Sequence, residues 1–93
     1  MAWRIDYTDT AMRQMRKLDK PSARRIMDYM DERVGSGDPR RTGRMLSGPL
    51  GRLWRYRVAD FRVICDIQDD ALRVLVVTVA RRDKAYRQWA GRP

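Results

Sequence analysis

The chain has 93 residues, of which 21 are lysine or arginine and 12 are acidic, so its formal net charge is +9. This length suits one small domain, and we expect residues 1–93 to fold as a single unit. The absence of histidine and the presence of one cysteine exclude an internal disulfide, zinc-ligand spacings and nucleophiles that need a histidine partner. No stretch approaches the ~18 consecutive apolar residues of a transmembrane helix. No secretory leader opens the chain, so we expect a cytoplasmic protein.

The basic residues are strongly biased toward arginine, since the only lysines are Lys17, Lys20 and Lys84. The planar guanidinium group binds phosphates through two parallel hydrogen bonds and stacks on bases. The composition therefore favours a nucleic-acid partner over a general cationic coat, although a membrane surface would also attract this charge.

Residues 3–18 predict a short strand and a first helix. Trp3, Ile5 and Tyr7 alternate with polar residues, as in a half-buried strand. Thr8 or Asp9 can cap the free amides of a following helix. The apolar stripe of this helix consists of Ala11, Met15 and Leu18, with Met12 beside it.

A second helix is predicted to begin at Pro21 and to end at Gly35 or Gly37, where glycine can adopt a left-handed cap. Its apolar stripe comprises Ala23, Ile26, Met27, Met30 and Val34. Residues 35–52 are rich in glycine and proline and predict a loop. The arginines of this loop either extend a basic surface or are simply solvated; they are Arg40, Arg41, Arg44 and Arg52.

The most informative stretch, residues 53–67, predicts a β-hairpin. If Ala59 and Asp60 alone form the turn, Val58 pairs with Phe61 and Arg57 lies opposite Arg62. One face then carries an arginine trio, and the other carries the aromatic residues. The trio consists of Arg55, Arg57 and Arg62. Like charges opposite each other repel, so the trio indicates a surface for a polyanion rather than an ordinary solvated face. Ala-Asp fits a two-residue turn poorly, however, and a longer loop would change the register.

The last part of the chain predicts a turn at Asp69-Asp70 and then a strand at residues 72–79, which we expect at the centre of the sheet. The polar tail includes a predicted short helix at residues 83–89. If neighbouring strands pair, the tail leaves the sheet beside the arginine hairpin. The predicted fold is α+β: an N-terminal strand, a helical hairpin, a three-stranded antiparallel meander in one sheet, and a short C-terminal helix.

Several short runs occur in this order: Lys17-Leu18, Leu46 with Gly48, Leu53-Trp54-Arg55-Tyr56-Arg57, Phe61-Arg62-Val63-Ile64, and Arg81-Arg82-Asp83 with Tyr86-Arg87. Because of these runs and their order, nearly the whole chain resembles the RelE/ParE superfamily of bacterial type II toxins, and the RelE-like branch in particular. The resemblance implies a toxin that enters the ribosomal A site and cuts mRNA without metal or cofactor, leaving a 2′,3′-cyclic phosphate. It also implies a small acidic antitoxin that wraps the toxin, and operator DNA that only the toxin–antitoxin complex binds.

The resemblance further implies a catalytic set of Arg55, Arg57, Arg62, Arg82 and Tyr86. Flanking residues expected to bind RNA are Arg52, Arg81, Lys84 and Arg87. The chain departs from relatives that carry lysines at the positions of Arg55 and Arg57, or a histidine near Ala80 or Arg81. Arginine holds its proton too tightly to act easily as a base, so Arg62 and Arg82 suit a phosphate clamp.

Tyr86 is the favoured candidate for proton transfer or base stacking, because surrounding cations favour its phenolate, and Lys84 is a second acid or base. Alternatively, Tyr86 packs the last helix against the sheet. Two other functions remain open at this stage. A ParE-like gyrase toxin would not need the trio around a phosphate. A basic RNA-binding module would leave RNA uncut but bind it with a strong salt dependence.

Overall fold

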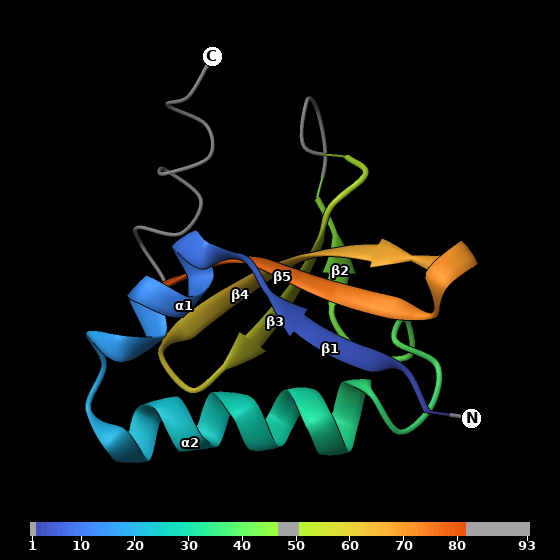
Figure 1. Ribbon diagram of the computed structural model, residues 1–93. Coiled ribbons are helices and arrows are strands. Elements are labelled where there is room, and N and C mark those ends of the chain that lie inside the picture. The colour runs from blue at the N-terminus through green and yellow to red at the C-terminus, as the bar shows by residue number, and fades with distance from the viewer. Residues whose placement is uncertain (1, 47–50, 82–93) are drawn as a thin grey trace.

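One five-stranded sheet, covered on one face by two helices, makes up residues 2–46 and 51–81, which are the residues that the computed structural model describes (Figure 1). The strands are β1 (Arg4–Tyr7), β2 (Arg44–Met45), β3 (Trp54–Val58), β4 (Phe61–Gln68) and β5 (Arg73–Arg81). Their order is β1-β5-β4-β3-β2, with β1 parallel to β5 and the other neighbours antiparallel. The α+β class and the meander are confirmed.

Two details of the sheet differ from the prediction. β5 is an interior strand, but the middle position belongs to β4. The short strand β2 lies in the segment that was predicted to be a loop, and it pairs with β3 at the edge of the sheet. The predicted turn at Asp69-Asp70 is a 3-10 turn, η3 (Asp69–Ala71), followed by Leu72 with a φ of 49°. The predicted helix at residues 83–89 lies outside the described residues.

Both helices begin at side chains that cap their free amides. In α1 (Asp9–Arg16), the hydroxyl of Thr8 accepts a hydrogen bond from the amide of Ala11 at 3.1 Å. In α2 (Lys20–Tyr29), the carboxylate of Asp19 accepts one from the amide of Ser22 at 3.1 Å. Neither of these helices has the length and apolar character needed to cross a membrane.

The end of α2 differs from the predicted glycine cap. The chain continues as a π-helical segment, η1 (Met30–Val34), and the amide of Gly35 donates to the carbonyl of Met30 at 2.8 Å. Gly35 has a φ of −75°, so the predicted left-handed conformation was wrong. Gly35 has little room for a side chain, because a Cβ at this residue would lie 3.2 Å from the carbonyl oxygens of Asp31 and Trp3.

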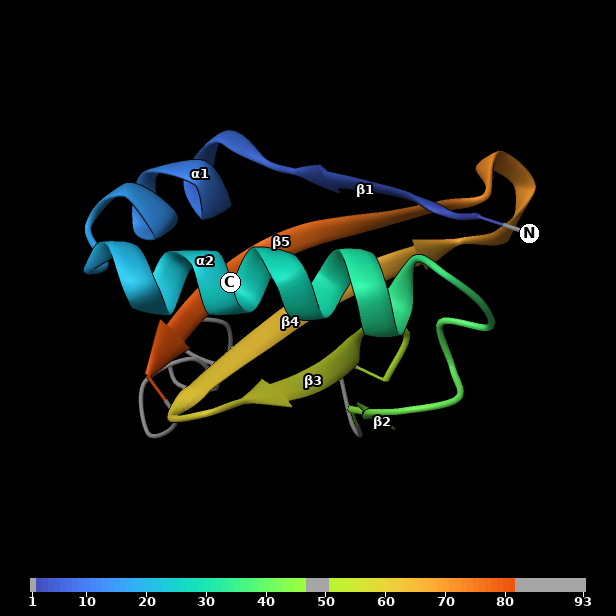
Figure 2. The same ribbon diagram turned by 90° about the horizontal axis from the view of Figure 1, so that it is seen from below.

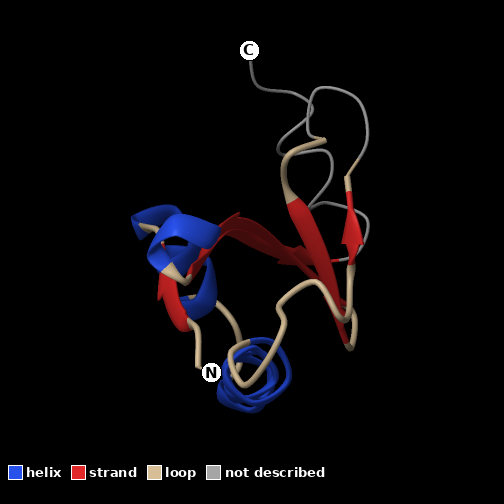
Figure 3. Ribbon diagram, turned by 90° about the vertical axis from the view of Figure 1, so that its right-hand side faces the viewer, coloured by secondary structure: helices blue, strands red, loops and turns tan. Residues whose placement is uncertain are grey.

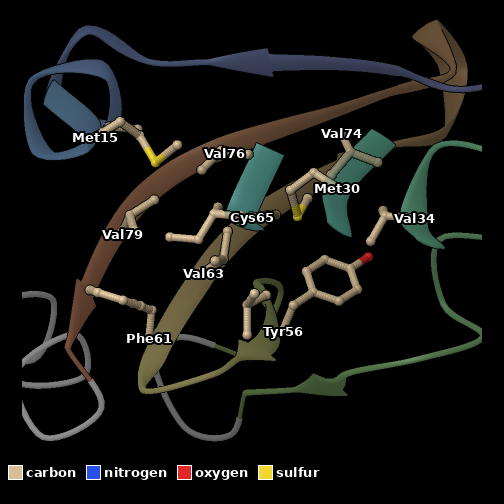
Figure 4. Packing of buried hydrophobic residues seen from close by; sticks show 13 residues of the cluster. Met15, Met30, Val34, Tyr56, Phe61, Val63, Cys65, Val74, Val76 and Val79 are labelled. Carbon is tan, nitrogen blue, oxygen red and sulfur yellow. The ribbon is translucent and has the colours of Figure 1, made fainter. Parts of the chain in front are cut away.

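The main hydrophobic core lies between the helices and the sheet, and Figure 4 shows its side chains pointing toward one another. Of the two predicted helical stripes, Ala11, Met15, Ile26, Met30 and Val34 are buried. The prediction for Met27 was wrong, because 46% of this residue is exposed. In the second helix the buried residues are therefore Ile26, Met30 and Val34, which are four residues apart. This spacing keeps them on one face because the wider π-helical segment η1 has more residues per turn than an α-helix. Figures 2 and 3 show the helices and the sheet from two further directions.

Candidate nucleic-acid interface

The candidate site begins at the two-residue turn between β3 and β4. Val58 pairs with Phe61 and Arg57 with Arg62, so Ala59 and Asp60 alone connect the strands, and the predicted register is confirmed. Ala59 has a φ of 52°, a conformation that costs a residue with a Cβ about 1–2 kcal/mol. The paired strands on either side hold the turn in this conformation despite its cost.

This register gathers the arginine trio on the face of the sheet away from the helices. Directly opposite residues of an antiparallel pair share a face, so Arg57 and Arg62 lie together, and Arg55 lies on the same face two residues earlier. On the other face, Tyr56, Phe61 and Val63 point into the core (Figure 4). The hairpin is therefore anchored by one face while the other presents three guanidinium groups.

A small apolar cluster lies beside the trio on the same face. Leu46, Leu53 and Ile64 are buried there, and Val77 and Ala80 pack against them. The Nε of Arg62 is also buried, and among the described residues it has no hydrogen-bond partner. Because a buried donor without an acceptor costs free energy, an anion that accepts from this group would stabilise the site.

The outer edge of β3 carries a pocket of about 390 Å³, lined by Tyr29, Thr42, Gly43, Arg44, Arg55 and Arg57. The loop before β2 forms one wall and is held by three hydrogen bonds. The indole of Trp54 donates to the carbonyl of Thr42 at 2.8 Å, and the hydroxyl of Tyr56 donates to the carbonyl of Pro39 at 2.5 Å. The hydroxyls of Tyr29 and Thr42 lie 2.8 Å apart.

Sequence reasoning missed two contributors to this pocket, Tyr29 and the pairing of Arg44 with Arg55. For Arg44 the sequence left open whether it extends the basic surface or is simply solvated, and the short strand β2 places it opposite Arg55, so it extends that surface. No periodic signal in a two-residue strand could have indicated this. Arg40, another arginine of the loop, lies elsewhere and binds both carboxylate oxygens of Asp69 at 2.9 Å, which lowers the pKa of Asp69.

The predicted RNA-binding residues do not all join the trio. Arg52 is exposed, and its guanidinium lies 3.9 Å from the carboxylate of Asp66. Arg81 pairs with Phe61 and places its guanidinium carbon 5.2 Å from the centre of that ring, on the helix side of the sheet. Four predicted site residues lie outside the described residues: Arg82, Lys84, Tyr86 and Arg87.

A β-bulge in β5 explains the orientation of Arg81. Cys65 pairs with Val76 and Ile64 with Thr78, so Val77 is an extra residue in β5. Gln14 of α1 holds this irregularity: its carbonyl oxygen accepts from the amide of Val79 at 2.6 Å, and its amide donates to the hydroxyl of Thr78 at 2.9 Å. Beyond the bulge the alternation is reversed, so Ala80 lies opposite Arg62 and Arg81 faces the helices.

Comparisons with known proteins agree with this architecture. The family described as the ParE toxin of the type II toxin-antitoxin system parDE matches residues 5–86. Toxin RelE of Mycobacterium tuberculosis is 30% identical over 91 residues, which cover 98% of this chain and 93% of that protein.

Two solved structures share the fold. A chain of the RelBE2 toxin-antitoxin complex from M. tuberculosis aligns with a TM-score of 0.82 and 22% identity, covering 88% of this chain and 93% of its own. A mutant E. coli toxin RelE in the free state aligns with a TM-score of 0.78 and 19% identity, covering 96% of this chain and 93% of its own.

Proposed function

The chain belongs to the RelE/ParE superfamily of type II toxins, and from that premise we propose that it is a ribosome-dependent endoribonuclease that cuts mRNA in the A site. The observation that supports RNA cleavage is the arginine trio, in which Arg57 and Arg62 lie directly opposite each other on the open face of the sheet. A gyrase-directed toxin would not need these three cations on one face to hold a phosphate. The proposed enzyme acts as one domain over residues 1–93 and in the cytoplasm, where ribosomes are found.

The proposed reaction is an attack by the ribose 2′-hydroxyl on the adjacent phosphorus. A base takes the hydroxyl proton, the 2′-oxygen bonds to phosphorus, the bond to the 5′-oxygen breaks, and an acid protonates that leaving oxygen. The products are a 2′,3′-cyclic phosphate and a 5′-hydroxyl. The phosphorane that forms between these steps carries extra negative charge, so positioned cations lower its energy.

Arg62 is proposed to bind this phosphorane, because its buried Nε has no acceptor among the described residues. Arg55 and Arg57 are proposed to hold the phosphate from the other strand of the hairpin, and Arg82 to complete the clamp. Guanidinium groups remain protonated and are poor bases, so proton transfer needs another group. We propose Tyr86 for that role, with Lys84 as the second candidate. No metal or cofactor takes part in this proposal.

A site built mainly from arginines has weak intrinsic acid-base groups, so we propose that the ribosome orients the mRNA for attack. The proposed protein partner is a small acidic antitoxin, which the net charge of +9 would attract. The M. tuberculosis and Pyrococcus horikoshii structures that share this fold are named as toxin-antitoxin and RelE-RelB complexes. For this chain, operator DNA is proposed to bind only the toxin–antitoxin complex.

Primer extension on mRNA from cells expressing the chain tests the proposal. We expect new cuts within translated codons, and we expect Arg62→Ala to reduce them about 100-fold or more. Arg16→Ala, which removes an exposed arginine of α1, serves as the matched control and should leave the cuts unchanged. Growth arrest without cuts would overturn the proposal and favour a gyrase toxin, which a supercoiling assay would detect. Neither arrest nor cuts would favour a binding module.

A further inference from the structure

We infer that the pocket at the outer edge of β3 is an RNA-binding subsite that holds a nucleotide next to the one that is cut. Its walls are Tyr29, Thr42, Gly43, Arg44, Arg55 and Arg57. This inference rests on the proposed function for the identity of the RNA, but its geometry is independent of cleavage.

Four arginines form a continuous row across three strands. Arg44 of β2 lies opposite Arg55 of β3, and Arg57 of β3 lies opposite Arg62 of β4. Opposite residues share a face, so all four side chains belong to the face away from the helices. Neighbouring strands are about 4.8 Å apart, and alternate residues of one strand are about 7 Å apart. The row therefore continues the trio outward to the edge of the sheet, where β2 and β3 lie side by side (Figure 2).

Two members of this row, Arg44 and Arg57, form no ion pair with any carboxylate of the described residues. Within the described ranges, carboxylates pair instead with Arg4, Arg40, Arg52 and Arg73. Each cross-strand pair of like charges costs stability in the absence of a ligand. A phosphate between them would remove this repulsion and accept hydrogen bonds from both guanidinium groups.

The pocket favours a nucleotide over an acidic peptide because an aromatic ring stands beside the cations. The hydroxyl of Tyr29 lies 2.8 Å from that of Thr42, and its ring meets the ring of Tyr56 edge-on with the centroids 6.2 Å apart. Tyr29 is thereby fixed before any ligand binds. Sites for single-stranded nucleic acid combine a basic groove with aromatic platforms for bases, whereas a carboxylate-rich peptide needs the charges alone. A volume of about 390 Å³ is also in the size range of a small-ligand site.

Binding to a short single-stranded RNA with 2′-O-methyl groups tests the inference, because this RNA has no 2′-hydroxyl to attack and remains intact. We expect Arg44→Ala to weaken binding roughly tenfold, the loss of about one charged hydrogen bond. We also expect it to reduce the slope of log affinity against log salt concentration by about 0.7. Arg44→Lys keeps the charge and should retain most of the slope with an intermediate affinity. Arg16→Ala should match the parent chain in both quantities.

An Arg44→Ala variant that binds this RNA with unchanged affinity and slope would overturn the inference. So would a variant that loses affinity for a glutamate-rich peptide of equal charge but not for RNA, since the pocket would then be a peptide site. The two proposals can fail separately. Arg44-dependent binding in a chain that cuts no mRNA would sustain the subsite and refute the nuclease. If the parent chain cuts mRNA but Arg44→Ala does not change RNA binding, the nuclease proposal is supported and the subsite is refuted.

Discussion

Gly43 lets the loop before β2 pass against the outer edge of β3. It has a φ of +83°, and a Cβ there would lie 2.5 Å from the carbonyl oxygen of Arg55 and 2.6 Å from the indole nitrogen of Trp54. We expect Gly43→Ala to lower the free energy of unfolding by about 2 kcal/mol or more, because strain and overlap add. Urea denaturation measures this. Gly37→Ala is the matched control and should have little effect, because the nearest atom is in the flexible guanidinium of Arg41, at 3.5 Å.

Tyr56 couples the stability of the fold to alkaline pH. Burial raises its pKa above the value of ~10 in an unfolded chain. The folded state therefore keeps a proton that the unfolded state loses, so the contribution of Tyr56 to the free energy of unfolding is fully present below about pH 10 and is lost as the pH rises further. We expect Tyr56→Phe to cost about 1 kcal/mol at pH 7 by removing the bond to Pro39, and to flatten the alkaline decline.

Urea denaturation of both chains between neutral and alkaline pH checks the Tyr56 prediction. Part of the decline should remain in the variant, because burial also raises the pKa of Tyr7 and the pKa of the Cys65 thiol. Parallel curves for the two chains across the whole range would show that Tyr56 ionises as easily in the fold as outside it.

At the scale of elements, the contact between α1 and β5 depends on one polar side chain. Gln14 satisfies the amide of Val79 and the hydroxyl of Thr78 at the bulge. Gln14→Leu should therefore destabilise the chain by about 1–3 kcal/mol, because the amide of Val79 loses its acceptor. Thermal or urea unfolding measures the effect. Arg13→Leu, at the preceding exposed position of the same helix, should stay close to the parent, and an equal loss in both would refute this role for Gln14.

Because the β3–β4 turn has only two residues, Ala59 adopts an unfavourable backbone angle, with a φ of 52°. Ala59→Gly should raise the free energy of unfolding by about 0.5–1 kcal/mol, since glycine adopts this angle without a steric penalty but loses more entropy on folding. Ala23→Gly, in the middle of α2, should have the opposite sign and cost about 1 kcal/mol. Calorimetric melting of both variants decides whether the turn is strained.

The fold could be predicted from the sequence wherever one face of an element is buried. Alternation fixed the register of β3 and β4 even though Ala59 is a poor turn residue, because a slip would have turned Tyr56 and Phe61 out of the core. The bulge at Val77 could not be predicted, because it depends on Gln14, 63 residues earlier in the chain. Arg81 consequently lies on the helix side of the sheet. The pocket was missed for the same reason, since Tyr29 and Arg44 come to line one pocket only in the folded chain.

At the scale of the whole molecule, the residues of the main core and the arginines of the proposed activity lie on opposite faces of the sheet. The helix face holds the larger core, and the opposite face holds the arginine row beside a cluster centred on Leu46, Leu53 and Ile64. The burial of Ile64, opposite Arg55, shows that the basic face rests on an apolar floor. Charges beside such a floor interact more strongly with a ligand than charges surrounded by water.

This arrangement predicts that repulsion between the arginines lowers the free energy of unfolding of the chain when no ligand is bound. Arg57→Thr removes one member of the Arg57–Arg62 pair and should raise the free energy of unfolding by about 0.5 kcal/mol at low salt. At about 1 M salt the screening length is only about 3 Å, so the gain should disappear. Urea denaturation at the two salt concentrations measures both values. Arg24→Gln lowers the net charge equally on an exposed part of α2, so a similar gain there would assign the effect to total charge. A gain confined to Arg57→Thr, together with weaker RNA binding by that variant, would locate the repulsion in the proposed site and show that a bound polyanion relieves it.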